Sequence, residues 1–100
     1  MLQRVWRCTI DPDRASEYED FARRISMPMF RRQRGYRGCI MARRDPHCEV
    51  LTLWDDEAAI QALDTSHSYN AAVAKIRIAG FVVEELGTTI LAAHEAEITV

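Results

Sequence analysis

Three histidines, His47, His67 and His94, are the side chains in this sequence best suited to move a proton at neutral pH. The reference pKa of histidine is about 6.5, so a small change of environment lets the imidazole accept or donate a proton. His67 falls at a predicted break between two helical segments, and His94 falls near the end of the last predicted strand. Both are therefore candidate proton carriers, and an exposed capping or loop histidine is the alternative interpretation.

The histidines and the three cysteines (Cys8, Cys39 and Cys48) lack the spacing of metal ligands. No HxxxH or CxxC pattern occurs, so we expect no metal site, zinc finger or disulfide framework. An odd number of cysteines without paired spacing is typical of a reducing compartment, which predicts a cytoplasmic protein.

Aromatic residues are the candidates for contact with a ligand. Trp6 lies in a predicted strand, where its ring could stack on a flat aromatic molecule. Trp54 ends another predicted strand and shares its face with Thr52. Tyr69 begins the apolar stripe of a predicted helix, and its hydroxyl could reach a cavity. Packing in the core is the alternative for each of these aromatic side chains.

The composition indicates one globular domain over residues 1–100. Hydrophobic residues make up 48% of the 100 residues and charged residues 28%, the balance of a folded, soluble protein. No apolar run approaches the roughly 18–20 residues that span a bilayer, so we expect no membrane association. The first ten residues, MLQRVWRCTI, carry charge inside their apolar stretch and do not resemble a signal peptide.

The arginines are unevenly distributed along the chain. Residues 21–48 hold eight arginines against the single acid Asp45, whereas residues 49–100 hold nine acids and two bases. The acidic isoelectric point and the missing basic recognition helix argue against nucleic acid as a partner. In the first strand, Arg7 is a candidate to hold an anionic substrate, and a solvated surface arginine is the alternative.

The first half of the chain predicts a strand and then a helix. Residues 3–10 are rich in β-forming residues, and Asp11-Pro12-Asp13 ends the strand. Apolar residues then recur with the helical period. We expect Pro28 to kink this helix or end it one turn early, with Ser26 capping a second short piece. Gly35 should stop it.

The second half predicts three more strands around a split helical region. Acidic residues mark the start of the first helical segment. Ser66 or Ser68 caps the second segment, which Gly80 closes. The strands cover residues 36–44, 48–54 and 86–94. The order β-α-β-β-α-β predicts an α+β, ferredoxin-like fold, in which helices cover one face of a four-stranded antiparallel sheet.

Both faces of this predicted sheet are largely apolar. In strand 48–54, Val50 and Trp54 point to one face, and Leu51 and Leu53 point to the other. A sheet with one face in water alternates cleanly with polar residues. The second face therefore needs a cover that the chain does not supply, and we predict a homodimer with sheet against sheet.

Residues 53–60 (LWDDEAAI) and 66–69 (SHSY) combine a strand ending in tryptophan, an acid-capped helix and a serine-centred break. Residues 35–39 (GYRGC) place glycines at the start of the second strand. In these features, and over nearly all its length, the chain resembles the antibiotic biosynthesis monooxygenase-like (ABM) domain. The resemblance implies a dimeric α/β barrel with a cavity between sheet and helices.

The resemblance also implies a role for Trp54, whose indole N–H would point into the cavity and orient a phenolic or quinone oxygen. The family includes cofactor-independent, quinone-forming oxygenases, and the strand-three asparagine of that branch falls at Val50 here. Valine can neither form a side-chain hydrogen bond nor relay a proton.

The family also includes haem-degrading enzymes, which use an asparagine on the first strand and a histidine on the second helical segment. This chain has Trp6 and Val73 at those places. We therefore expect no haem binding, unless His67 or His94 substitutes for the missing histidine.

The resemblance leads to the hypothesis of a cofactor-independent monooxygenase that acts with O2 on a small aromatic, phenolic or quinone-type compound. No bound cofactor is expected. The predicted catalytic residues are Trp54, His67 and His94, and the predicted substrate-binding residues are Trp6, Thr52, Tyr69 and Arg7. The alternative is a non-catalytic dimer that binds a small apolar molecule, which the valine at position 50 favours.

Overall fold

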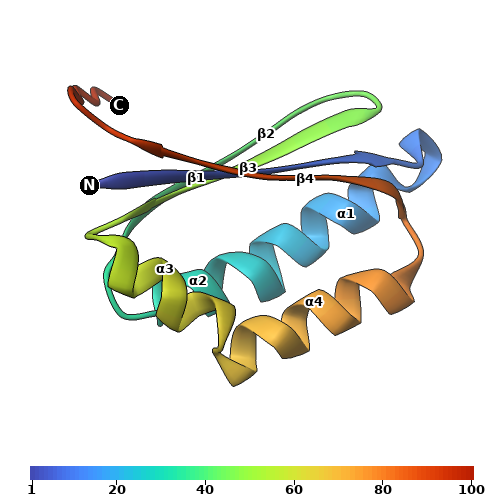
Figure 1. Cartoon of the computed structure of the whole chain (residues 1–100). Coiled ribbons are helices and arrows are strands. Elements are labelled where there is room, and N and C mark those ends of the chain that lie inside the picture. The colour runs from blue at the N-terminus through green and yellow to red at the C-terminus, as the bar shows by residue number, and fades with distance from the viewer.

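A four-stranded antiparallel sheet forms one layer of the computed structural model, which describes residues 1–100 (Figure 1). The strands are β1 (Leu2–Ile10), β2 (Tyr36–Arg44), β3 (His47–Trp54) and β4 (Val82–Ala92). Their order is β2-β3-β1-β4, and each neighbouring pair is antiparallel. The predicted hairpin of residues 36–44 and 48–54 is confirmed, and β1 and β3 take the central positions.

All the helices lie on the same face of the sheet (Figure 1). The chain passes from β1 through a short 3₁₀ turn, η1 (Pro12–Arg14), into the first helix. The remaining elements are α1 (Ala15–Phe21), the π-helical turn η2 (Ala22–Ser26), α2 (Met27–Arg31), α3 (Glu57–Asp64) and α4 (His67–Ala79). The predicted α+β, ferredoxin-like fold is therefore confirmed, with its second helical region split into α3 and α4.

Side-chain caps set the limits of α3 and α4 as the sequence predicts. The Asp56 carboxylate accepts the Ala59 N–H at 2.9 Å, and the Ser66 hydroxyl accepts the Tyr69 N–H at 3.3 Å. Each bond satisfies a backbone donor that has no partner within its helix. Gly80, with φ of 81°, ends α4 in the left-handed conformation.

Pro28 does not end the helix one turn early, which was one of the two predicted outcomes. The helix widens at η2, where the Met27 N–H donates to the Ala22 carbonyl five residues earlier. Pro28 then lies in the first turn of α2, where its missing N–H needs no helical partner. Ser26 makes no capping hydrogen bond, so the predicted cap is wrong.

The last strand starts at Val82, earlier than the predicted residue 86. Glu84 and Glu85 both pair with β1. Carboxylates are uncommon in strands, which is why the sequence conceals this part of β4. The pairing then shifts, and Gly87 continues the strand with φ of 97°. This irregularity lies beside the cavity described below.

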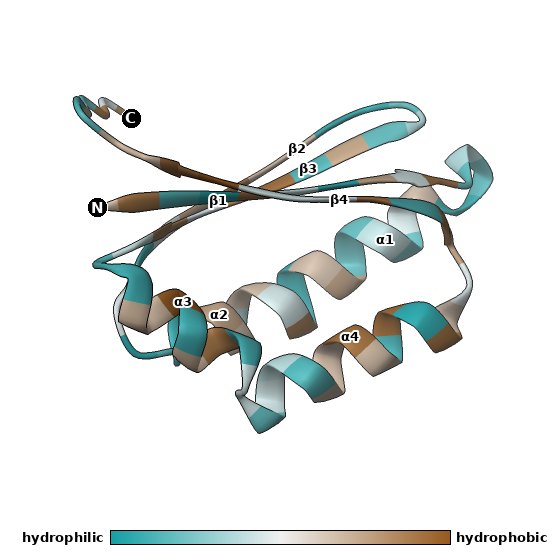
Figure 2. Ribbon diagram, in the orientation of Figure 1, coloured by the Kyte–Doolittle hydropathy of each residue, from teal (hydrophilic) through white to brown (hydrophobic).

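The core fills the space between the sheet and the helices in two clusters. One cluster packs Trp54 and Val50 of the sheet against Phe30 and Leu63 of the helices, and the other surrounds Cys8. Figure 2 shows hydrophobic residues along the strands and on the helices below them. Side chains alternate between the two faces of a strand, so every second residue of β1 faces the helices.

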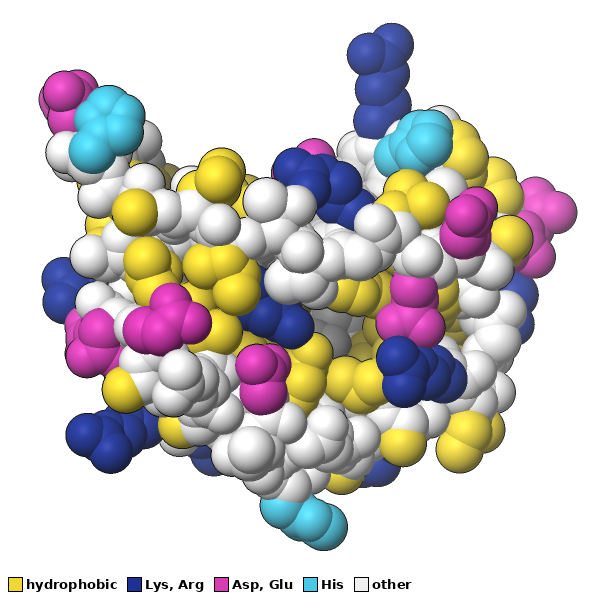
Figure 3. Space-filling model, viewed as in Figure 1, with side chains coloured by type: hydrophobic (Ala, Val, Ile, Leu, Met, Phe, Trp, Pro, Cys, Tyr) yellow, Lys and Arg dark blue, Asp and Glu magenta, His cyan; other side chains and the backbone are white.

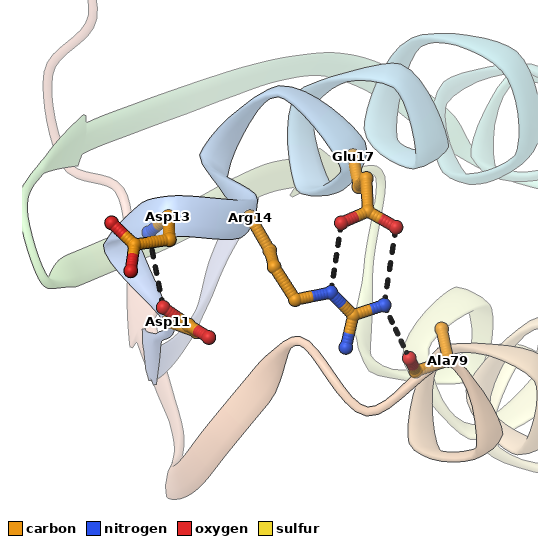
Figure 4. A network of polar contacts seen from close by, with 5 residues as sticks. All are labelled: Asp11, Asp13, Arg14, Glu17 and Ala79. Carbon is orange, nitrogen blue, oxygen red and sulfur yellow. Dashed lines mark hydrogen bonds and ion pairs between the residues drawn. The ribbon is translucent and has the colours of Figure 1, made fainter.

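Arg14, which directly precedes α1, joins the start of that helix to the end of α4 (Figure 4). Its Nη2 donates to the Ala79 carbonyl at 2.8 Å, and its Nε donates to the Glu17 carboxylate at 2.8 Å. A guanidinium at this position also complements the negative end of the α4 dipole. In the same turn, the Asp11 carboxylate accepts the Asp13 N–H at 3.0 Å. These contacts hold α4 against α1, and both helices border the cavity.

A candidate binding cavity between the sheet and the helices

A cavity of about 380 Å³ lies between the two layers of the fold. All four strands contribute to its lining, together with α1, η2, α2 and α4. Figure 3 shows the side of the molecule hollowed between the layers, with hydrophobic side chains around the opening and charged side chains beside it. Twelve of the eighteen lining residues are hydrophobic. A volume of this size and an apolar lining fit a small organic molecule.

Aromatic side chains form much of the wall. Trp6 of β1, Phe21 of α1, Phe30 of α2 and Tyr69 of α4 all line the cavity. The structure thus brings together Trp6 and Tyr69, two of the predicted substrate-binding residues. Flat rings on several sides favour a flat aromatic ligand, because such a ligand can stack or make edge contacts with each ring.

Arg4 is the most buried of the polar lining residues that the sequence interpretation missed, and Glu85 is another. Only 5% of the surface of Arg4 is exposed, and this residue lines the cavity from β1. Its Nη2 donates to the Tyr69 hydroxyl oxygen at 2.7 Å, and its Cζ lies 5.3 Å from the centre of the Tyr69 ring. Strand alternation could have found it, because Arg4 and Trp6 are two residues apart and share a face.

Trp54 lies in the core and is not part of the cavity lining. Its indole is fully buried, in edge-on contact with the rings of Phe30 and Tyr36. Its Nε1 donates to the Thr52 hydroxyl at 2.8 Å. The structure therefore differs from the prediction that this N–H faces a ligand, because Thr52 already accepts it. Thr52 is also fully buried outside the lining.

None of the histidines lines the cavity. His67 is the first residue of α4 and is exposed there, next to the capping Ser66. His94 follows the end of β4, and its side chain is 91% exposed. The two predicted proton carriers thus lie apart from the aromatic wall, and the cavity offers no imidazole to a substrate or to haem iron.

Arg7 points away from the cavity. It alternates with Trp6 on β1, and its Nε contacts the Glu49 carboxylate at 3.4 Å on the uncovered face of the sheet. Arg7, predicted to hold an anionic substrate, is therefore not one of the residues that line the cavity. The strand period is the reason, since the odd-numbered and even-numbered residues of β1 face opposite sides.

One carboxylate does reach the cavity lining, from Glu85 of β4. The Arg77 guanidinium on α4 holds it with two hydrogen bonds of 3.0 and 3.1 Å. Both side chains are partly exposed, and they connect the helix layer to the edge strand. Tyr18 is also a lining residue, and burial raises the pKa of its hydroxyl. This phenol is therefore neutral at physiological pH.

The cysteines are protonated thiols in this environment. Burial raises the pKa of Cys8 to about 12 and the pKa of Cys39 to about 11. Burial also raises the pKa of Cys48, which lies opposite Cys8 across β1 and β3. None of the three lines the cavity. A reactive cysteine requires a lowered pKa, so these thiols do not have the properties of a nucleophile.

Two further features bear on the kind of site. No group of three or more metal-ligating side chains comes together in the chain. None of the helices combines the length and the apolar composition that crossing a membrane requires. Among the charged residues that line the cavity, Arg4 is the most buried.

No protein-family model and no curated protein matches the sequence. Solved structures do match. SnoaB, a cofactor-independent oxygenase from Streptomyces nogalater, is 17% identical and superposes with a TM-score of 0.77, over 95% of this chain and 94% of that chain. A proposed antibiotic biosynthesis monooxygenase from Deinococcus radiodurans is 14% identical with a TM-score of 0.79, over 100% of this chain and 99% of that chain.

A protein of unknown function from Nitrosomonas europaea is 16% identical with a TM-score of 0.74, over 99% of this chain and 94% of that chain. At such identities the similarity shows the fold, and one fold hosts many functions. The predicted family resemblance thus agrees with the solved structures. The chain has the fold of the antibiotic biosynthesis monooxygenase-like proteins.

Proposed function

We propose that the chain is a cofactor-independent monooxygenase of small aromatic, phenolic or quinone-type compounds. The observation that carries the proposal is the aromatic-walled cavity with a buried guanidinium. The fold adds support, because SnoaB, which shares it, is a cofactor-independent oxygenase. The proposed partners are a second copy of the chain and the substrate.

The proposed reaction needs an ionised, electron-rich substrate that can give an electron to O2. The positive charge of Arg4 in an apolar cavity favours the ionised form of a phenol or enol. The released proton goes to solvent, because Glu85, the carboxylate in the lining, is already held by Arg77. A ring methylene then becomes a carbonyl: one oxygen atom of O2 enters the product, and the other leaves with the two hydrogens as water.

Oxygen uptake by the metal-free protein tests this function, with a panel of anthrones, hydroquinones and catechols as substrates. We expect protein-dependent uptake that falls about tenfold or more in Arg4→Gln, since a charge-assisted contact is lost. Arg34→Gln, an exposed arginine in the turn before β2, is the matched control. Uptake that is the same in Arg4→Gln and wild type would contradict the proposed role of the cavity.

Two further variants test the predicted catalytic residues in the same assay. Trp54→Phe removes an indole N–H that Thr52 accepts in the core, and His67→Ala removes an exposed imidazole. We expect both to keep uptake within about twofold of wild type when they are folded. A large loss in either variant would restore a catalytic role for that residue.

The second candidate function is a non-catalytic dimer that binds a small aromatic molecule. The absence of any imidazole from the lining, together with Val50 at the cavity wall, favours it. Binding of panel compounds without oxygen uptake would support this function over the first. Haemin is added to the protein as a further test. An unshifted Soret band would agree with either function and would exclude haem binding as a third candidate function.

A further inference from the structure

The position of Arg4 follows from two simple features of the sequence. Arg4 and Trp6 lie on the face of β1 that the helices cover, and Thr52 is paired with Arg4 on the neighbouring strand. The guanidinium therefore lies under the helix layer, with 5% of the residue exposed. Removing a charge from water is costly unless hydrogen bonds and an opposite charge compensate it.

No carboxylate of the chain compensates Arg4. The ion pairs in the structure involve other arginines, and the cavity carboxylate, Glu85, is held by Arg77. The side chain of Arg4 donates one hydrogen bond, to Tyr69. A guanidinium has five N–H donors, so most of them have no acceptor in the protein.

These remaining donors are open to the cavity. No side-chain nitrogen or oxygen in the structure is both fully buried and without a hydrogen-bond partner. The unpaired nitrogens of Arg4 are therefore accessible, and Arg4 is a lining residue. The Tyr69 hydroxyl adds a further donor, because its oxygen accepts from Arg4 at 2.7 Å while its own hydrogen has no acceptor among the protein's hydrogen bonds.

From this arrangement we infer that Arg4 and Tyr69 form an oxyanion-recognition site, and that the ligand of the cavity is an aromatic anion. Its carboxylate or ionised phenol oxygen would accept hydrogen bonds from the guanidinium and the tyrosine hydroxyl. Its ring would lie among Trp6, Phe21 and Phe30. This inference deepens the proposed function, because it defines the ligand class of the same cavity.

A pair of probes with the same ring and different charge tests the inference. 2-Naphthoate and 2-naphthamide are titrated into the protein in oxygen-free buffer, so that binding is measured without turnover. We expect wild type to bind the carboxylate at least tenfold more tightly than the amide. Arg4→Gln should remove this preference, and Arg34→Gln should keep it. Equal binding of both probes, or a preference unchanged in Arg4→Gln, overturns the inference, whether or not the protein consumes O2.

Tyr69→Phe provides a test that does not depend on how well a buried arginine variant folds. It removes one oxygen and leaves the ring in place. We expect binding of 2-naphthoate to weaken several-fold and binding of 2-naphthamide to stay the same. Circular dichroism confirms that each variant is folded. An unchanged affinity for 2-naphthoate in folded Tyr69→Phe would overturn the site.

A coloured phenol distinguishes the two sources of the oxyanion. 4-Nitrophenol is titrated with pH in the presence of wild type and of Arg4→Gln. A lowered pKa of the bound phenol in wild type alone supports an ionised phenol as a ligand. Binding of 2-naphthoate without this shift supports a carboxylate. If neither anion binds to wild type, the oxyanion site is overturned.

Discussion

The hydrogen bond between Trp54 and Thr52 shows how a residue suited to chemistry can serve the core. Both side chains are fully buried, and the Nε1 to Oγ1 distance is 2.8 Å. A buried indole N–H needs an acceptor, because no water can replace a lost partner there. Thr52 supplies that acceptor from the same strand face two residues away. The pair fixes the indole against Phe30 and Tyr36.

Thr52→Val tests this pairing. Valine keeps the shape of threonine but leaves the Trp54 N–H without an acceptor, so we expect unfolding to become easier by about 1–3 kcal/mol. Chemical denaturation followed by tryptophan fluorescence measures the change. Thr9→Val is the matched control, since Thr9 is a partly exposed threonine on β1 with no side-chain hydrogen bond. Equal losses in both variants would contradict the importance of the bond.

Part of the candidate site was predictable from residue types, and part was not. Strand alternation and helical periodicity placed Trp6 and Tyr69 near a cavity, and both line it. Arg4 was missed because arginine is usually exposed, although alternation places it beside Trp6. His67 was selected for its chemistry, but whether a side chain points into a cavity depends on how α4 packs, which no local pattern reveals.

At the scale of elements, the local signals were the reliable ones. The caps of α3 and α4 depend on hydrogen bonds within three residues, so Asp56 and Ser66 could be read from the sequence. The continuation of the helix past Pro28 depends instead on a π turn, which has no simple sequence signature. The start of β4 was hidden because Glu84 and Glu85 join the sheet through backbone pairing with β1.

The turn between α2 and β2 depends on Gly35. Its φ is +77°, and a Cβ there would lie 2.5 Å from the Ala59 Cβ on α3. Gly35→Ala should therefore destabilise the fold twice over, by about 1 kcal/mol of left-handed backbone strain and by about 1–3 kcal/mol of overpacking. The free energy of unfolding in urea measures the sum.

Gly87→Ala separates these two contributions. Gly87 has φ of +97°, and a Cβ there would meet no atom within 4 Å. We expect this variant to lose only the contribution of backbone strain. If Gly35→Ala were no more destabilised than Gly87→Ala, the close packing of the turn against α3 would not be a significant constraint on the fold.

At the scale of the whole molecule, the helices leave one face of the sheet uncovered (Figure 1). Pairing between the strands aligns Ile40 with Leu51 on this face, and Leu53 is flanked by Gly38 and Gln3. Leu91 of β4 is aligned with the same Gln3. Ile40 is 54% exposed and Leu91 is 55% exposed. An apolar sheet face of this kind is stabilised when a second copy covers it.

We therefore expect the wild-type chain to sediment as a homodimer at micromolar concentration. Leu91→Glu should shift it to monomer, because association would bury a carboxylate without a partner. Ile78→Glu introduces the same charge on α4, at a side chain that is 86% exposed in the helix layer, and should leave the dimer intact. A monomeric wild type would contradict sheet-to-sheet pairing, as would equal effects of the two substitutions. If the dimer forms as expected, the apolar residues of both sheet faces have a structural explanation: one face packs against the helices of its own chain, and the other packs against its partner.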